Sequence, residues 1–332
     1  MPSTPLRIAF VGQPEYFRST YENDLAELGE VREFRYNFSM TTQDFVPLIE
    51  FAADFNFFFR GEYVPTDVLR LLKGTNINLS SEPFPRLIEG RIEYTFDSIN
   101  RYTWFRDIRN QPYDYVFHYE EASLALMARD GLYLSGEFVF PVAINTYRHT
   151  KQVPLWDIFF IGRSTEHRER FFGPLKHYFN FLHICHGVWG PALVDYLNAA
   201  KICLNVHAED EVSWEPRMQM MLATGAFVIS ERITPNRYLR PGVDYVEVET
   251  RNEMLEAVRY YLENDVERER IAISGMNRVH EVLSSRACFQ DLIRNISGGR
   301  CPRFRTEKGK LLLDFYSTML RKWYSVRRLV TA

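Results

Sequence analysis

The sequence has few cysteines and no long apolar run. Its four cysteines, Cys185, Cys203, Cys288 and Cys301, are widely spaced and form no Cys-x-x-Cys pair. This spacing indicates neither a disulfide framework nor a zinc ribbon. No stretch reaches the roughly 18 apolar residues that a membrane helix needs, and the first residues contain no apolar signal-peptide core. We therefore expect reduced thiols, no integral membrane segment and a cytoplasmic location.

Strong net charge and repetition are also missing. The formal net charge is −3 over 332 residues, which speaks against broad electrostatic binding to nucleic acid. We find no internal repeat and no low-complexity tract. The chain is 46% hydrophobic and 25% charged, as in ordinary globular proteins. Aromatic residues make up 15% of it, and we expect them to pack mainly in the cores.

The length predicts two domains, because one hydrophobic core rarely extends over more than about 250–300 residues. Apolar runs predict strands at 6–11, 31–36, 56–59, 76–80 and 113–118, and then at 156–161, 181–185, 201–207 and 226–230. Helical patterns occupy residues 21–28, 44–53, 67–73, 169–178, 191–199, 215–224, 252–263 and 266–283. This alternation predicts an α/β protein with two doubly wound, mostly parallel sheets. We place the domains at residues 1–150 and 151–300, followed by a helical tail at 301–332.

The tail carries apolar residues at helical spacing within residues 310–328 and several basic residues. Such a helix can touch a membrane surface or pack back against its own protein. The short, aromatic-rich apolar face favours packing.

In open parallel sheets the ligand lies beyond the carboxyl ends of the strands, and a cleft between two such domains is the expected site. This rule selects candidates before any other consideration. From the first domain it selects Gly12, Gln13, Glu15, Arg60, Glu82, His118 and Glu120. From the second it selects Gly162, Arg163, His186, Gly187, His207 and Glu231.

The most informative segment is 213–225, which begins with Ser213, Trp214 and Glu215. Ser213 is a suitable N-cap, and Pro216 suits a first helical turn. A helix that begins here would present free N–H groups to an anion, and Arg217 would add a guanidinium. We therefore expect a phosphate-binding site at residues 213–217, although an Arg on an ordinary surface helix has the same pattern.

The ordered series of motifs in the second half resembles the C-terminal domain of group 1 glycosyltransferases, which have the two-domain GT-B fold of Rossmann-like domains. It looks closest to the CgeB-like, spore-maturation-type branch. The residues that carry the resemblance include Gly162, Arg163, Gly187, Tyr196, Asn198, Asn205, Ser213, Arg217, Ala223, Gly225, Gly242, Asp244, Gly275 and Arg278. The similarity covers about residues 156–293 well and the first half weakly.

The resemblance implies a hexosyltransferase-type enzyme that moves a sugar from a nucleoside-diphosphate sugar to a glycan or other hydroxyl acceptor. It places Gly162 and Arg163 near the donor diphosphate, Gly187 near the base, and Ser213 and Arg217 at the phosphates. The family usually has a Glu three residues after this Arg, where this sequence has Met220. Either Glu215 or Glu231 takes that role, or donor recognition differs, or activity has been lost.

We predict a metal-independent reaction without a cofactor beyond the donor. No Asp is followed two residues later by another Asp, so positive charge must come from Arg163, Arg217 and helix N-termini. The acidic run 209–211 is interpreted as a solvated loop rather than a metal site. Glu15 and His118 are candidate bases in the first domain, and His118 equally fits a structural role.

Two alternatives were weighed against the transferase. The group His183, Cys185, His186 and His207 fits no standard zinc spacing, and strand alternation places Cys185 and His186 on opposite faces. The stronger alternative is an inactive GT-B module that binds a nucleotide or glycan, or a sugar-nucleotide epimerase of the same architecture. Met220 motivates this alternative.

Overall fold

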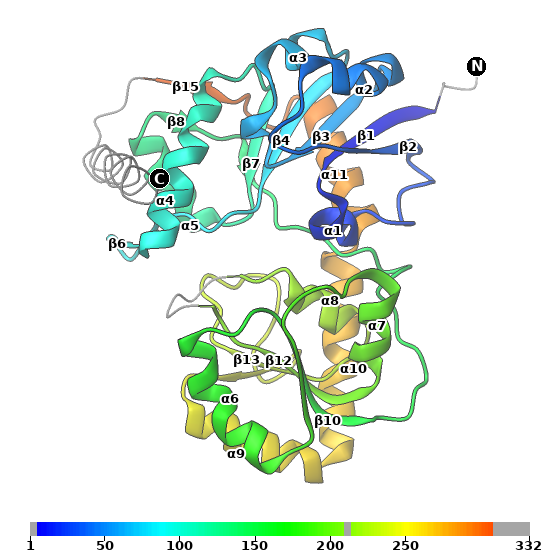
Figure 1. The fold of residues 1–332 in the computed structure, drawn as a ribbon, viewed down its shortest axis with the longest axis vertical. Helices are drawn as coiled ribbons and strands as arrows, with labels where there is room; N and C mark the ends of the chain where they lie inside the picture. The colour runs from blue at the N-terminus through cyan, green and yellow to red at the C-terminus, as the bar shows by residue number, and fades with distance from the viewer. Residues whose placement is uncertain (1–4, 209–213, 308–332) are drawn as a thin grey trace, which may run out of the picture. The chain divides into compact units, whose positions relative to one another are not determined.

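The computed structural model describes residues 5–208 and 214–307. Within these ranges the chain forms two compact α/β units (Figure 1). Unit 1 comprises residues up to Pro14, Leu28–Val139 and the residues from Arg294 onward. Unit 2 comprises Glu15–Glu27 and Phe140–Ile293. The division thus falls at residues 139/140 and 293/294, and a short N-terminal segment joins unit 2, whereas the sequence predicted contiguous domains.

Unit 1 is built on a six-stranded parallel sheet of order β2-β1-β3-β4-β7-β9. Its strands are β1 (Leu6–Gly12), β2 (Gly29–Arg35), β3 (Phe55–Phe59), β4 (Thr75–Ser80), β7 (Tyr115–His118) and β9 (Gly136–Glu137). All five residues of β3 are buried, as expected for a central strand covered on both faces. Phe10 of β1 stacks on Phe57 with ring centroids 5.4 Å apart. The abundant aromatic residues therefore serve the core, as predicted.

The helices of unit 1 are short. They are α2 (Val46–Phe51), α3 (Thr66–Leu71), α4 (Phe96–Phe105) and α5 (Glu121–Arg129), with 3₁₀ turns at Thr42–Phe45, Gly61–Tyr63 and Arg106–Asn110. Two small antiparallel pairs complete the unit: β5 (Arg86–Ile88) with β6 (Arg91–Glu93), and β8 (Leu132–Tyr133) with β15 (Arg305–Thr306). The sequence analysis assigned no element to residues 86–110, where short strands and a polar helix give little periodicity.

Unit 2 contains a five-stranded parallel sheet of order β11-β10-β12-β13-β14. Its strands are β10 (Trp156–Ile161), β11 (Phe181–Ile184), β12 (Ala200–Asn205), β13 (Val228–Glu231) and β14 (Val246–Val248). Its helices are α1 (Pro14–Phe17) with a 3₁₀ turn at Arg18–Thr20, α6 (Glu166–Tyr178), α7 (Gly190–Asn198), α8 (Arg217–Ala223), α9 (Arg251–Glu263) and α10 (Asp265–Val282). Helix α11 (Ser285–Ser297) crosses the division between the units.

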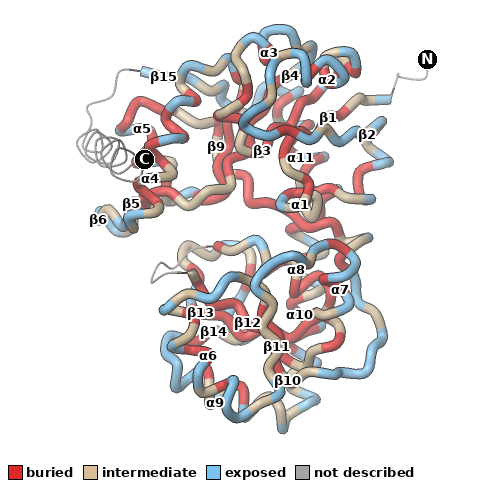
Figure 2. Tube along the Cα trace, viewed as in Figure 1, coloured by how far each residue is buried: buried red, intermediate tan, exposed pale blue. Residues whose placement is uncertain are grey.

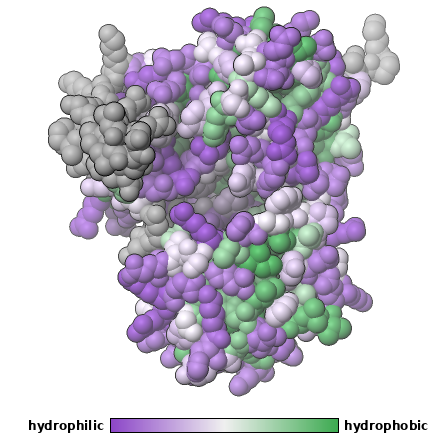
Figure 3. Space-filling view, in the orientation of Figure 1, coloured by the Kyte–Doolittle hydropathy of each residue, from purple (hydrophilic) through white to green (hydrophobic). Residues whose placement is uncertain are grey.

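Helices cover both faces of the unit 2 sheet, as the predicted doubly wound arrangement requires (Figure 1). Helices α6 and α9 pack together on one face, and α8 and α10 pack together on the other. Burial follows the same plan, because the strands form the most deeply buried parts of the chain (Figure 2). The visible surface is mostly hydrophilic (Figure 3). None of the helices in the described residues has both the length and the apolar character of a membrane span.

Three sequence predictions about helices are wrong. Residues 21–28 form turns rather than a helix, with Asn23 at φ +60°. The buried Asp24 instead accepts hydrogen bonds from the backbone N–H groups of Ile144 and Asn145, at 2.7 and 2.9 Å, a local role that favours loops over helix. Helix α3 spans Thr66–Leu71 rather than the predicted residues 67–73, with Pro65 at its N-cap. Helix α8 begins at Arg217, with Pro216 at the N-cap.

Two further predictions concern the tail helix and the cysteines. The tail helix at 310–328 lies outside the described residues. The four cysteines are all described, and none of them forms a disulfide within the described residues.

The close packing of α10 against α8 depends on Gly275. A Cβ there would overlap the Asp244 carbonyl oxygen and lie 2.7 Å from Leu222 Cδ2. We predict that Gly275→Ala lowers the free energy of unfolding by about 2 kcal/mol, measured by urea denaturation. The matched control is Gly173→Ala in α6, where a Cβ meets no atom within 4 Å. It should leave stability unchanged or raise it by up to about 1 kcal/mol. Equal stability of the two variants would contradict the packing argument.

Candidate functional site

The order of the unit 2 sheet reverses between β10 and β12. In such sheets the ligand-binding crevice opens at this switch point, beyond the carboxyl ends of the two strands. Strand β10 ends at Ile161 and is followed by Gly162 and Arg163. Strand β12 ends at Asn205 and leads to His207. The structure therefore brings three of the predicted donor residues, from segments far apart in the sequence, to one edge of one sheet.

Two arginines are anchored at this edge by main-chain carbonyls. Arg168, from α6, donates from Nε to the Val206 carbonyl (2.9 Å) and from Nη1 to the Arg163 carbonyl (2.9 Å). Arg217, the first residue of α8, donates to the Ile161 carbonyl (3.1 Å) and the Val206 carbonyl (3.0 Å). Both side chains are largely buried. These bonds fix two positive charges side by side.

The ring of Phe160 supports both guanidinium groups. The Cζ atoms of Arg168 and Arg217 each lie 5.0 Å from its centroid. Arg217 is further positioned by a hydrogen bond from Nε to Asn205 Oδ1 (2.8 Å). Burial, and next the neighbouring Arg217, lower the pKa of Arg168 to about 10. At neutral pH both side chains remain charged, so the edge presents a rigid cationic pair, which we call the arginine pair.

Gly162 lies against the arginine pair and has φ +144°. A Cβ at this position would come within 2.9 Å of Arg217 Nη1 and 3.2 Å of Arg168 Nη1. A side chain there would thus be strained in the backbone and would crowd both guanidinium groups. The geometry explains why glycine follows β10.

Glu231 and His207 form the other side of this edge. One carboxylate oxygen of Glu231 accepts the backbone N–H of His207 (2.7 Å), and the other lies 2.8 Å from His167 Nε2. His207 Nε2 lies 2.8 Å from the Arg232 carbonyl, so in the neutral ring Nε2 carries the proton. Burial is the main cause that lowers the pKa of His207. Its Nδ1 is buried and makes no hydrogen bond with any described residue.

The remaining predicted donor residues divide into open and enclosed groups. Arg163, His186 and Gly187 are exposed, and the Arg163 side chain makes no ion pair within the described residues. Trp214 is buried, and its indole N–H donates to Gln219 Oε1 (2.9 Å), so it packs inside the protein. Ser213 lies outside the described residues. The N-cap position that the sequence analysis gave to Ser213 is held by Pro216.

The zinc alternative is not supported by the geometry. His183 directs Nε2 to the Gly162 carbonyl at 2.8 Å, while His207 is tied to the Arg232 carbonyl. In the part of the chain that the structure describes, no three His, Cys, Asp or Glu side chains are grouped in a way that would hold a metal ion. The acidic run 209–211 lies outside that part.

Unit 1 has its own switch point, between β1 and β3. Gly12 ends β1, and its carbonyl accepts the Tyr36 N–H (3.0 Å); Gln13 follows. Arg60 follows β3 in a left-handed conformation, φ +58°. Its Nη1 lies 3.1 Å from Glu82 Oε1. The structure thus brings the predicted pair Arg60 and Glu82 together.

The sequence analysis missed Phe38 and Tyr63, two aromatic neighbours of Arg60. Its guanidinium lies over the rings of Phe38 and Tyr63, at 5.6 and 5.7 Å, and Phe38 is 56% exposed. Glu62 is almost completely buried beside it, and burial raises the pKa of its carboxyl. An exposed aromatic at the start of a loop is the signal that could have identified Phe38.

Three predicted residues of the first domain have other roles. Glu120 is 3% exposed and forms a buried ion pair with Arg86 (3.0 Å). Its side chain therefore stabilises the core and is not placed to bind an acceptor. Glu15 belongs to unit 2 and not to unit 1. His118 is fully buried, with its ring stacked on Phe84 at 4.8 Å. Direct contact of this ring with a substrate is incompatible with its position.

The burial of His118 has a measurable consequence. Within the described ranges, neither ring nitrogen makes a hydrogen bond of normal geometry. Burial lowers the pKa of His118 from 6.5 to about 3, although the Ser80 backbone opposes the shift. The unfolded chain therefore takes up a proton below about pH 6.5 that the folded chain does not, so stability falls as the pH falls from about 6.5 to 3. The full contribution is present above pH 6.5.

We predict that His118→Phe reduces this acid sensitivity. Between pH 7 and pH 5 the variant should lose up to about 2 kcal/mol less unfolding free energy than the wild type, because it has no proton to gain on unfolding at this position. Urea denaturation at the two pH values measures the difference. An identical loss in both proteins would show that His118 is solvated or already protonated in the folded state.

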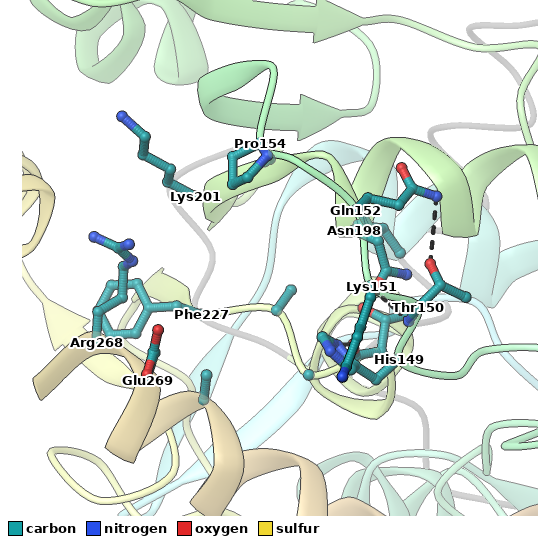
Figure 4. Close-up of a pocket in the computed structure, with 16 residues that line it drawn as sticks. His149, Thr150, Lys151, Gln152, Pro154, Asn198, Lys201, Phe227, Arg268 and Glu269 are labelled. Atoms are coloured by element: carbon teal, nitrogen blue, oxygen red, sulfur yellow. Dashed lines mark hydrogen bonds between the residues drawn. The ribbon is translucent and has the colours of Figure 1, made fainter. Parts of the chain in front are cut away.

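A pocket of about 280 Å³ lies at the opposite edge of the unit 2 sheet, near the amino ends of β12 and β13 (Figure 4). Lys201, Arg268 and Glu269 line one side, and His149 and Lys151 line the other. Lys201 is bound to Asp157 (2.8 Å) and Arg268 to Asp265 (2.7 Å). The pocket lies at the amino ends of the strands, whereas ligands of open parallel sheets bind beyond the carboxyl ends, so the carboxyl edge with the arginine pair is the stronger candidate site.

Comparison with known proteins matches the second half of the chain to a described family. Residues 159–294, which include the whole arginine pair, match a protein family described as glycosyl transferase-like. No curated protein matches the sequence. The matched residues correspond closely to the part of the chain in which the sequence analysis found its resemblance.

Solved structures share the fold of most of the chain. HepE of Anabaena in complex with UDP and glucose superposes with a TM-score of 0.55, 10% identity, and coverage of 88% of this chain and all of that chain. Sucrose-phosphate synthase of Thermosynechococcus elongatus superposes with a TM-score of 0.56 and 11% identity, and the match covers 89% of this chain and all of that chain. An alpha-glucosyltransferase in complex with UDP and a 13-mer DNA superposes with a TM-score of 0.57 and 9% identity, and the match covers 88% of this chain and 99% of that chain. The predicted GT-B fold is thereby confirmed.

Proposed function

We propose that this protein is a glycosyltransferase that transfers a hexosyl group from a nucleoside-diphosphate sugar to an acceptor hydroxyl. The observation that carries the proposal is the arginine pair, fixed by main-chain carbonyls at the switch point of the unit 2 sheet. A rigid pair of guanidinium groups suits the two phosphates of such a donor. The matched family and the GT-B fold of structures that contain UDP support the same reaction class.

The proposed reaction requires this edge to stabilise the leaving diphosphate. The bond between the anomeric carbon and the diphosphate oxygen breaks, the acceptor oxygen bonds to that carbon, and the acceptor proton passes to a base. Negative charge then grows on the leaving diphosphate. Arg217 and Arg168 are fixed before the reaction, so they can stabilise this charge without reorganisation, and Arg163 can close over it from the exposed side.

This arrangement underlies our proposal that the reaction is independent of a metal ion and of any cofactor beyond the donor. The cationic groups that would take the place of a divalent ion come from the chain itself, and the sequence has no Asp-x-Asp motif. The narrower placement in the CgeB-like branch and a cytoplasmic location remain part of the proposal. They rest on the motif series and on the free cysteines.

Donor recognition must differ from the resembling family at one position, since Met220 replaces its Glu. Of the two acids that could substitute, Glu231 uses both carboxylate oxygens within the protein. Glu215 is 25% exposed in its side chain and contacts Arg168 and Arg217. We assign the substitute role to Glu215. For the acceptor, we propose the edge of unit 1 formed by Arg60, Glu82 and the exposed ring of Phe38.

The proposal predicts release of a nucleoside diphosphate when the protein is incubated with UDP-, GDP- or TDP-sugars and a panel of hydroxyl acceptors. Release should continue at an unchanged rate in EDTA. Loss of activity in EDTA with recovery in Mg²⁺ or Mn²⁺ would contradict the metal-independent reaction. Donor binding without turnover across the panel would favour a binding module, and interconversion of the sugar without an acceptor would favour an epimerase.

Arg163 offers a test that leaves the buried arginines intact. Because its side chain is exposed and unpaired within the described residues, Arg163→Ala should not affect folding. We predict about tenfold weaker binding of the nucleoside diphosphate, equivalent to about 1.4 kcal/mol, measured by calorimetric titration. The control is Arg170→Ala, an exposed arginine of α6 that pairs with Glu166 (2.6 Å); it should change affinity less than about twofold. Equal effects of the two substitutions would remove Arg163 from the site.

A further inference from the structure

Glu215 occupies the outward side of the arginine pair. Its Oε1 lies 2.9 Å from Arg217 Nη2 and 3.5 Å from Arg168 Nη2. The same oxygen lies 4.0 Å from the buried Nδ1 of His207, which makes no hydrogen bond with any residue that the structure describes. Three nitrogen atoms from three separate segments therefore face one carboxylate oxygen.

The direction of these contacts matters. Most N–H groups of the pair point back into the protein: Arg168 uses Nε and Nη1 on carbonyls, and Arg217 uses Nε on Asn205 and Nη1 on the Ile161 carbonyl. Nη2 of Arg217 also donates to the Val206 carbonyl (3.0 Å), but the Nη2 atoms of both arginines are the ones that contact the carboxylate. An anion that approaches the pair from the open side would meet the position that Glu215 now fills.

We propose that Glu215 is an internal competitor for the phosphate position, and that a donor diphosphate binds by displacing its carboxylate from the arginine pair. The inference rests on the proposed donor site and describes how that site is regulated. It makes the ligand-free site self-neutralised, because a buried cationic pair without a counter-charge would be costly. It also assigns Glu215 two successive positions: on the arginines without donor, and free to reach a donor hydroxyl once displaced.

The attachment of Glu215 shows why it can leave. Its Oε1 contacts the arginine pair, and its side chain is 25% exposed, against 4% for Arg168 and 10% for Arg217. Glu231, in contrast, is 8% exposed and has both oxygens engaged. Glu215 also precedes α8, so its side chain can rotate outward without a change in the helix. A diphosphate offers more charge and more acceptor oxygens than one carboxylate, so it can replace it.

The charge balance gives the expected direction. Arg163, Arg168 and Arg217 carry three positive charges at this edge, and Glu215 and Glu231 carry two negative ones. Removing the charge of Glu215 raises the net positive charge that an incoming anion meets, and it also removes the group that must be displaced. Both effects strengthen anion binding.

The experiment measures inorganic pyrophosphate and UDP binding to the full-length protein by calorimetric titration, for the wild type, Glu215→Gln and Glu215→Ala. We expect pyrophosphate to bind both variants at least about tenfold more tightly than the wild type. Pyrophosphate is the deciding probe because it has no ribose or sugar hydroxyl for Glu215 to bind. The matched control is Glu166→Gln, which removes an exposed carboxylate from α6 that pairs with Arg170 and not with the arginine pair. It should change affinity less than about twofold, and thermal unfolding confirms that each variant is folded.

The outcomes separate this inference from the proposed function. If the wild type binds pyrophosphate and both Glu215 variants bind it equally or more weakly, the competitor role is overturned, whereas the donor site stands. If the Glu166 variant gains as much as the Glu215 variants, general electrostatics explains the change and the inference is likewise overturned. If neither the wild type nor any variant binds pyrophosphate or UDP, the anion site itself is wrong and both proposals fail.

Discussion

The structure depends on the way in which the end of one parallel sheet holds two arginine side chains. Peptide carbonyls at Ile161, Arg163 and Val206 cannot pair within the sheet where the strands end, and they accept instead from Arg168 and Arg217. The same bonds that complete the sheet edge therefore build the cationic site. Gly162 is required because nothing larger fits beneath the guanidinium groups. Fold and candidate chemistry share one set of hydrogen bonds.

Much of this arrangement could be predicted from the sequence. Buried parallel strands are short apolar runs, so all nine predicted strands appear with small shifts at their ends. The rule that ligands bind at carboxyl ends then selected Gly162, Arg163 and His207, and the helix that follows β12 supplied Arg217. Arg168 was missed because its role is visible only once α6 folds back over Phe160. One indication of this role was present in the sequence, because Arg168 lies on the first helix after the Gly162 turn.

The failures have physical causes of the same kind. Sequence position at a strand end does not distinguish a side chain that faces solvent from one that turns into the core. Glu120 met a buried Arg86 and became structural, and His118 was enclosed by Phe84. The Trp214 indole N–H donates to Gln219, and its ring is buried. In residues 21–28 the pattern resembled a helix, but the Asp24 carboxylate satisfies distant backbone N–H groups and holds a turn. Except at Trp214, whose partner Gln219 is five residues away, a partner far along the chain decided the outcome.

The central claim is that the arginine pair receives a diphosphate in the place now held by Glu215. The most direct measurement is a crystal structure of the protein with a bound nucleoside diphosphate. The account predicts phosphate oxygens within hydrogen-bond distance of Nη2 of both Arg168 and Arg217, with the Glu215 carboxylate moved away from them. A diphosphate bound elsewhere, with Glu215 still paired to both arginines, would contradict it.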